Sequence, residues 1–275
     1  MVVKNLYCSQ ALNDGLHEAM EENQKVLFIG EDILDPYGGA FKVAKGLSTK
    51  FPDRVYPTPI CEAAIVGIAN GLALRGFVPV VEIMFGDFIT LAFDQIINHL
   101  SKYNAMYHGK VNPHLVIRTP MGGHRGYGPT HSQSLEKFLI GIPNIKVLYP
   151  SHLHPIKNML KKAINKEPKP VIFLENKQLY SIRNQTPKKN KIGYFDTIFS
   201  EDDFPTVTLS LCNFKTADVT FVCFGGIVPM VMNEAVRLLT EKEIYCELVI
   251  LSQISPINML PVVESVSRSK RIITV

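Results

Sequence analysis

Short apolar segments alternate with longer amphipathic segments through the first two thirds of the chain. The apolar runs predict strands at 25–30, 78–83, 114–119, 145–150 and 170–175. Most of these runs are apolar on both faces, as expected of parallel strands that are covered by helices on each side of a sheet. The amphipathic segments predict helices at 8–22, 61–75, 87–105 and 153–166. This alternation predicts a doubly wound α/β fold with a parallel sheet.

The pattern changes after residue 183. The segment that follows contains two prolines and adjacent basic and acidic clusters, which is typical of an exposed connector between domains. The strand–helix rhythm then resumes, with helices expected near 229–242 and 259–268. We therefore expect three parts, listed in chain order: a large domain at 1–185, a linker at 186–216 and a small α/β domain at 217–275.

Composition narrows the classes of function. The net charge of +4 comes without a long basic block, so nothing favours nucleic-acid binding. No apolar run is long enough to cross a bilayer, and the N-terminus does not have the layout of a signal peptide. The five cysteines form no CxxC pair, which argues against a zinc site or a disulfide framework. We therefore expect a cytoplasmic protein in a reducing compartment, with neither a membrane nor a nucleic acid as partner.

Glu62 begins an otherwise apolar helix within TPICEAAIVGIANGLALRG. An acid in the first turn of a helix has a simple explanation, because the helix dipole favours negative charge there. The alternative is a carboxylic acid in apolar surroundings, with a raised pKa that lets it exchange a proton with a bound heterocycle. Position alone leaves both interpretations open.

A loop with four glycines follows the strand predicted at 114–119. Its sequence, TPMGGHRGYGPTHSQS, contains neither a P-loop nor a dinucleotide fingerprint, and an ordinary ordered loop is the simpler reading. His124 and His131 in this loop are acid/base candidates, because imidazole titrates near neutral pH.

The segment at 82–102 carries several large apolar side chains, among them Met84 and Phe88. Core packing is the default reading, and an aromatic face for stacking a planar ring is the alternative. Asp87 is expected at a helix end or in solvent. His152 and His154 are a poor metal pair on a helix, and no metal-binding residues are predicted on this chain.

Taken together, three segments closely resemble the β subunits of thiamine diphosphate-dependent 2-oxo acid dehydrogenases, a family that includes pyruvate, branched-chain 2-oxo acid and acetoin dehydrogenases. The first segment begins at EDILDPYGGAFKVAKG and ends at FITLAFDQIINH, the second is RTPMGGHRGYGPTHSQS, and the third is IFLENKQLY. They occur in the same order as in the family and with nearly unchanged spacing. The resemblance implies a transketolase-like pyrimidine-binding domain followed by a transketolase C-terminal domain. It also implies an oxidoreductase that decarboxylates a 2-oxo acid and passes the acyl group to a lipoyl domain.

The resemblance assigns roles to four residues. Glu62, in ICEAAIVG, matches the glutamate that activates the cofactor by exchanging a proton with its pyrimidine ring. His131, in the HSQ motif, matches the histidine that positions intermediates and supports acyl transfer to the lipoyl arm. Met84 and Phe88 match positions that pack against the aminopyrimidine.

The chain lacks the GDG motif and following asparagine that bind the diphosphate-anchoring metal in thiamine diphosphate enzymes. NDG at 13–15 lies in a predicted helix, and FGD at 85–87 has the wrong order. The resemblance therefore implies that an α subunit holds Mg²⁺ and the diphosphate, within an α2β2 tetramer that has a β–β contact. A lipoyl acyltransferase component would receive the acyl group.

The chain ends at RIITV, where members of the family usually continue, so the C-terminal domain is expected to be shortened. Two other functions stay open. One is a half-enzyme of another thiamine diphosphate-dependent transferase or synthase. The other is a non-catalytic scaffold subunit.

Overall fold

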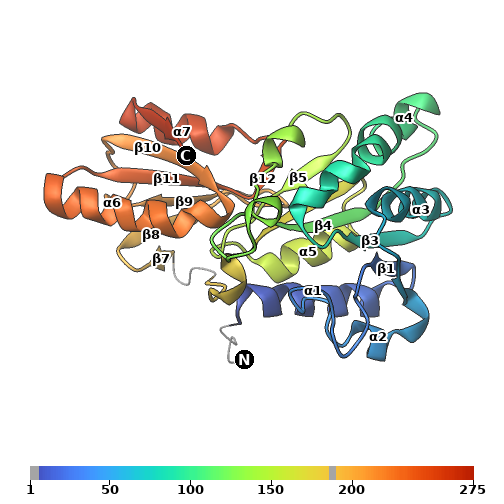
Figure 1. The fold of residues 1–275 in the computed structure, drawn as a ribbon. Coiled ribbons are helices and arrows are strands. Elements are labelled where there is room, and N and C mark those ends of the chain that lie inside the picture. The colour runs from blue at the N-terminus through green and yellow to red at the C-terminus, as the bar shows by residue number, and fades with distance from the viewer. Residues whose placement is uncertain (1–5, 186–189) are drawn as a thin grey trace.

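The computed structural model describes residues 6–185 and 190–275 of the chain. It contains two sheets with helices packed on them, and the two sheets lie next to each other (Figure 1). Within the described residues the first sheet has seven strands. In spatial order these are β12 (Gln253–Ser255), β5 (Lys146–Leu148), β6 (Val171–Asn176), β4 (Val116–Met121), β3 (Val78–Glu82), β1 (Val26–Gly30) and β2 (Val55–Pro57).

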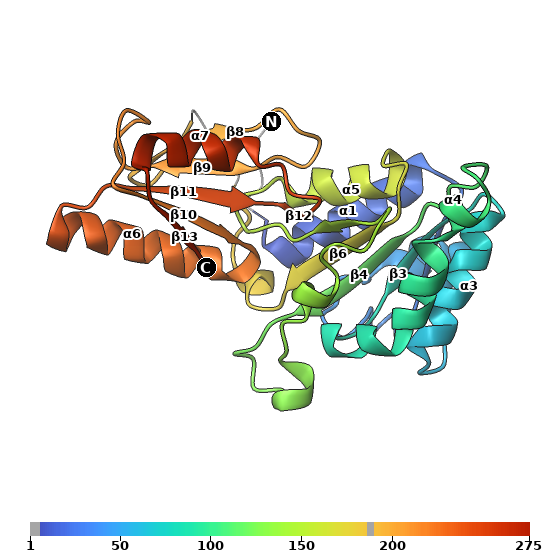
Figure 2. The same cartoon turned by 90° about the horizontal axis from the view of Figure 1, so that it is seen from above.

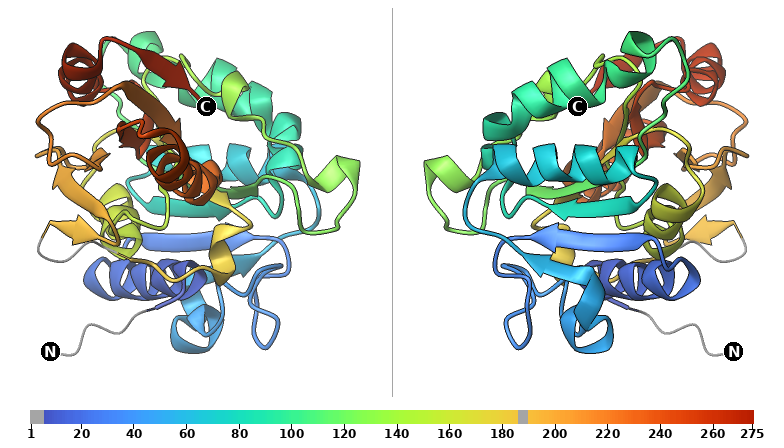
Figure 3. Two further views of the ribbon diagram at one scale, coloured as in Figure 1. Left: turned by 90° about the vertical axis from the view of Figure 1, so that its left-hand side faces the viewer. Right: turned by 90° about the vertical axis from the view of Figure 1, so that its right-hand side faces the viewer.

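All neighbouring strands of this sheet run parallel except the pair of β12 and β5. Successive residues of a strand point to opposite faces, so Val80 and Val116 belong to one core while Val81 and Ile117 belong to the other. Helices cover both faces, with α1 on one side and α3 on the other (Figure 3). The expected doubly wound architecture is confirmed.

The helices begin and end close to the predicted positions, with two exceptions. The α-helices are α1 (Cys8–Glu22), α2 (Leu47–Lys50), α3 (Glu62–Leu74), α4 (Tyr103–Met106), α5 (Ile156–Asn165), α6 (Val228–Lys242) and α7 (Leu260–Ser269). Helix α5 begins three residues later than expected, because Ser151 donates its N–H to Nδ1 of His154 and forms a turn there (2.9 Å). None of the helices in the described ranges is long and apolar enough to cross a membrane.

The helix expected at 87–105 is the second exception. The chain instead forms a 3-10 helix, η2 (Gly86–Ala92), then a π-helix, η3 (Gln95–Leu100), and then α4. Thr90 donates its hydroxyl to the carbonyl of Asp87 three residues earlier (3.0 Å), which suits the tighter 3-10 winding. The remaining short turns are η1 (Pro52–Arg54), η4 (Pro129–His131), η5 (Glu136–Phe138), η6 (Leu179–Ser181) and η7 (Gly225–Ile227).

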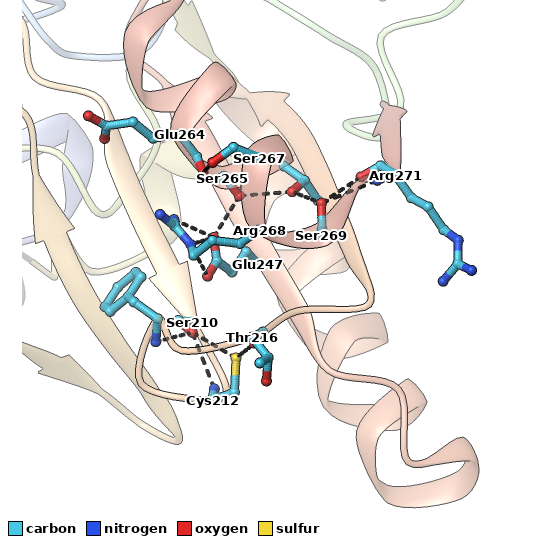
Figure 4. A network of polar contacts seen from close by, with 12 residues as sticks. Ser210, Cys212, Thr216, Glu247, Glu264, Ser265, Ser267, Arg268, Ser269 and Arg271 are labelled. Atoms are coloured by element: carbon cyan, nitrogen blue, oxygen red, sulfur yellow. Dashed lines mark hydrogen bonds and ion pairs between the residues drawn. The ribbon is translucent and has the colours of Figure 1, made fainter.

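The second sheet has six strands in the part of the chain that the structure describes. In spatial order they are β13 (Ile272–Thr274), β10 (Val219–Phe224), β11 (Cys246–Leu251), β9 (Val207–Ser210), β8 (Phe195–Phe199) and β7 (Lys191–Ile192). Helix α7 is fastened to this sheet by Glu247, which is buried and accepts hydrogen bonds from Arg268 and Ser265 (Figure 4).

The segment expected as an exposed linker contributes three strands of that sheet. Strands β7, β8 and β9 all lie within 186–216, and Phe195, Val207 and Leu209 are buried in the core of the second sheet. Residues 186–189 lie outside the described residues. The polar composition around these strands masked them, because only alternate positions face the core. The division into domains itself stays a prediction.

The two sheets exchange segments. After β11 the chain crosses to the first sheet, where β12 pairs antiparallel with β5 and Ser252 accepts the N–H of Tyr149 (2.6 Å). Leu251 belongs to a core of the first sheet, and Leu153 belongs to the core of the second. Each part of the chain therefore completes a core of the other, and Figure 2 shows β12 reaching across.

Candidate active site

The predicted site residues gather at one edge of the first sheet, where the parallel strands end. Glu31 follows β1, Met84 follows β3, and the glycine-rich loop at 122–134 follows β4 and extends away from the sheet (Figure 2). Glu62 begins α3, a short distance after β2. The carboxyl ends of parallel strands are where α/β folds place their ligands, so this edge is the candidate site.

Glu62 is paired with a second buried acid, Glu31. Glu62 is 4% exposed and Glu31 is 6% exposed. Burial, together with the charges of Glu62 and Asp32, raises the pKa of Glu31 to about 7, and a hydrogen bond from the N–H of Cys61 opposes part of this rise. Oε1 of Glu31 is buried and has no hydrogen-bond partner among the described residues. At neutral pH Glu31 can therefore hold or release a proton.

The imidazole of His131 lies in an aromatic cluster. Its ring meets Phe85 edge-on, with 4.8 Å between ring centroids, and Phe88 edge-on at 5.1 Å. Phe85 also contacts Phe41 and Tyr127. Phe88 is only half-buried. The structure thus brings together two of the predicted residues, His131 and Phe88.

Helix packing joins this cluster to the acid pair. Helix α3, whose first residue is Glu62, packs against η2, which carries Phe88. Met84 is half-buried at the end of β3, just before η2. All four predicted residues therefore lie on adjoining segments, while their catalytic and binding roles stay predictions.

The structure separates the other histidines from this group. His124 is exposed, and it lines a cavity of about 670 Å³ between the two sheets rather than the aromatic cluster. His152 and His154 are buried at the junction of the sheets, and burial lowers the pKa of each to about 4. No group of three His, Cys, Asp or Glu in residues 6–185 and 190–275 could hold a metal ion.

A buried ion network lies beneath the site. Arg118 donates to Glu175 from Nε (2.7 Å) and Nη2 (2.9 Å), and to Glu82 from Nη1 (2.8 Å). Tyr180 adds its hydroxyl to Glu175 (2.7 Å). Gly39 closes over this network with φ +82°, and a Cβ there would lie 2.6 Å from Oε1 of Glu82. The network fixes the ends of β3, β4 and β6 and the loop above them.

Three residues of the site were not identified from the sequence. Glu31 carries a signal that could have revealed it, since it is an acid placed directly after a fully buried strand. Asp87 was expected at a helix end or in solvent, and it lies in the first turn of η2, but its burial and its hydrogen bonds to the loop were not foreseen. It is 6% exposed and its Oδ1 accepts from the N–H and Nε2 of Gln133 (3.1 and 2.9 Å). Lys177, fully buried after β6, gave no signal of its own.

Comparison with known proteins agrees with this fold. Residues 4–183 match the family described as the transketolase, pyrimidine binding domain. Among solved structures, a split-gene transketolase in an inactive β4 tetramer has a TM-score of 0.72 at 20% identity, over 98% of this chain and 79% of that one. The fold and site thus define a transketolase-type pyrimidine-binding protein.

Relatives with assigned activities are more specific. The pyruvate dehydrogenase E1 component subunit beta of Leifsonia xyli subsp. xyli is 37% identical over 98% of this chain and 76% of the relative. The 3-methyl-2-oxobutanoate dehydrogenase subunit beta of Mycobacterium tuberculosis is 35% identical, over 98% and 74%. An acetoin:2,6-dichlorophenolindophenol oxidoreductase subunit beta of Cupriavidus necator is 34% identical, over 100% and 80%. The chain belongs to the family of 2-oxo acid dehydrogenase E1 β subunits.

Proposed function

We propose that this chain supplies the pyrimidine side of the active site of a thiamine diphosphate-dependent 2-oxo acid dehydrogenase. One observation carries the proposal: a buried pair of acids, Glu62 and Glu31, at the ligand-binding edge of the sheet. Glu31 of this pair can hold or release a proton near neutral pH, and activation of an aminopyrimidine requires such an exchange of a proton at the site. The enzyme would release CO₂ from the 2-oxo acid. It would oxidise the carbon from which CO₂ leaves to the level of an acyl group. The lipoyl disulfide is reduced in the same step, one sulfur taking the acyl group and the other a proton.

The site has features that fit the aminopyrimidine of thiamine diphosphate. Buried oxygens without a hydrogen-bond partner in the described residues include Oε1 of Glu31 and Oγ1 of Thr58, and a bound polar ring would satisfy such atoms. Phe88 offers a half-buried aromatic face and Met84 a half-buried thioether. When bound, the cofactor would supply the electron sink for decarboxylation. Glu62 would hold the proton at the ring, and His131 would orient the acyl group for transfer.

An uncovered apolar surface beside the site supports a partner chain. Ile60 is 83% exposed, Leu91 is 60% exposed and Ile68 on α3 is 57% exposed. Large apolar side chains that cluster at the rim of a site mark a protein interface. We place an α subunit there, holding Mg²⁺ and the diphosphate, in an α2β2 assembly with a β–β contact. A lipoyl acyltransferase component would take the acyl group from this assembly.

We further propose that the protein works in the cytoplasm. All five cysteines are free, and Cys61 is exposed beside the site, which suits a reducing compartment. Cell fractionation with an antibody against the chain would test this placement.

The central experiment is reconstitution with a cognate α subunit. We expect 2-oxo acid-dependent acylation of a lipoyl domain that is lost in Glu62→Gln, while circular dichroism shows an unchanged fold. Transfer to an aldehyde instead of a lipoyl domain would indicate another thiamine diphosphate enzyme. No heat on titrating thiamine diphosphate into the assembled wild-type complex would indicate a non-catalytic scaffold.

A further inference from the structure

Lys177 contacts the last residue of β4 and two residues of the glycine-rich loop that follows it. Its backbone N–H donates to the carbonyl of Met121 directly before the loop (3.0 Å), and its carbonyl accepts from Nη1 of Arg125 (3.2 Å). Its ammonium donates to the carbonyl of His131. One residue at the end of β6 therefore holds the beginning of the loop and the residue that carries the imidazole.

Asp87 holds the far end of the same loop. Its Oδ1 accepts from both the N–H and the side-chain amide of Gln133, two residues beyond His131. Gln133 in turn accepts the N–H of Gly122 (3.1 Å), which closes the base of the loop. His131 thus lies between a buried cation and a buried anion, each bonded to the loop within two residues of it.

The Lys177 ammonium also contacts the ring on which the imidazole rests. Its Nζ is 5.1 Å from the centroid of Phe85 and 5.9 Å from that of Tyr127. Aromatic faces attract a cation, so these rings help to keep the ammonium in place. Phe85 therefore contacts both the Lys177 ammonium and the His131 ring. This shared contact couples the position of the imidazole to Lys177.

A buried lysine that is not paired directly with a carboxylate needs such hydrogen bonds and aromatic contacts to offset the loss of its hydration. Lys177 is 0% exposed. Burial lowers the pKa of its ammonium and the charge of Arg125 lowers it further, whereas the charge of Asp87 opposes this. An apolar side chain would fill the same space without any desolvation penalty. What it could not provide is the hydrogen bond to the carbonyl of His131.

We propose that Lys177, together with Asp87, is a positioning residue that fixes the imidazole of His131 for acyl transfer to the lipoyl domain. The inference rests on the proposed function and deepens it. Lys177 acts through the loop and is not itself a reacting group. Its removal should therefore slow acyl transfer more than decarboxylation, because decarboxylation depends on the acid pair at the other end of the site.

The test compares Lys177→Met, Lys177→Arg and a matched control, Lys146→Met, in the assembled αβ enzyme. Lys146 is a partly buried lysine that is paired with Glu167, away from the loop. Two rates are measured for each variant: 2-oxo acid-dependent reduction of an artificial electron acceptor, and reductive acylation of a lipoyl domain. Hydrogen exchange of peptides covering 122–134 is followed in parallel and needs no activity.

We expect Lys177→Met to speed exchange in the loop by about tenfold, with the strands of the sheet unchanged. Acylation should fall at least about tenfold more than artificial-acceptor turnover, because a small displacement of a positioned group is costly. Lys177→Arg should restore part of the acylation rate. Lys146→Met should change neither the exchange of the loop nor the ratio of acylation to artificial-acceptor turnover. Unchanged loop exchange, or an equal loss of both rates in Lys177→Met, would overturn the proposal.

Failure of the proposed function would look different. Wild-type enzyme would then show no 2-oxo acid-dependent turnover, while the exchange experiment would still report whether Lys177 holds the loop. If Lys177→Met does not fold, Asp87→Asn takes its place, because it keeps the shape of the side chain and weakens the anchor at Gln133. The same split between the two rates supports the proposal, and an equal loss of both contradicts it.

Discussion

Two groups of buried charges lie at the same edge of the sheet and differ in how they are neutralised. In the network of Glu82, Arg118 and Glu175, each carboxylate accepts a hydrogen bond from the central guanidinium. In the pair of Glu31 and Glu62, like charges face each other and one oxygen has no partner in the described residues. Burial raises the pKa of Glu175 in the first arrangement and that of Glu31 in the second, but the neighbouring Arg118 opposes the rise for Glu175, whereas the charge of Glu62 adds to it for Glu31.

The difference shows how a structural acid can be distinguished from a reactive one without any ligand. Burial is similar in both groups, so burial alone does not distinguish a structural acid from a reactive one. What decides is whether opposite charge and hydrogen bonds satisfy the carboxylate. By this criterion Glu31, whose Oε1 has no partner in the described residues, can take up a proton near neutral pH, whereas Glu82 and Glu175 are held by Arg118.

The largest effect is expected for Glu62→Gln in the assembled enzyme. Loss of a group that exchanges a proton with the reacting system lowers turnover by about 10²- to 10⁴-fold. Steady-state kinetics would measure this loss, and thermal denaturation should show a chain at least as stable as wild type, since one of two like charges is gone. Retained turnover would place Glu62 with the structural acids.

Arg118→Met should act on stability instead. Removing one partner of a buried ion network leaves uncompensated charge and costs about 3–5 kcal/mol of unfolding free energy. Urea denaturation of the β chain would measure it. A neutral result would mean that Glu82 and Glu175 take up protons readily, and the contrast between the two groups would then disappear.

Glu31 should make stability depend on pH. Its pKa of about 7 in the fold lies above its ordinary value of 4.5, so the folded chain binds the proton more tightly between these values. Stability should therefore fall as the pH rises from about 4.5 to about 7. Glu31→Gln should remove this fall and add at most about 3 kcal/mol above pH 7. Parallel urea titrations of both proteins across this range would show the difference, and coincident curves would contradict it.

Gly39→Ala should have the smallest effect, about 1–3 kcal/mol, because a side chain at φ +82° is strained and its Cβ would meet Glu82. Gly71→Ala is a suitable control, since a Cβ there meets nothing within 4 Å. Equal melting temperatures for the two variants would argue that the loop adjusts freely over the ion network.

The sequence predicted the parallel sheet because strands such as 25–30 and 170–175 are apolar on both faces. It could not predict β8 and β9, in which polar residues such as Asp196 and Thr208 alternate with apolar side chains of the core. It also missed the broken helix after residue 86, because local periodicity does not register the bonds from Gln133, 46 residues away, that hold Asp87. Glu62 and His131 were found through motif resemblance. Lys177 was not, since its importance lies in contacts across the fold.

The crossing of β12 into the first sheet has a consequence for how the molecule denatures. Since Leu153 and Leu251 each complete the hydrophobic interior of the opposite half, neither half can melt without exposing part of the other. Calorimetry should accordingly record one cooperative endotherm for the whole chain, and two resolved peaks would show that the strand exchange contributes little.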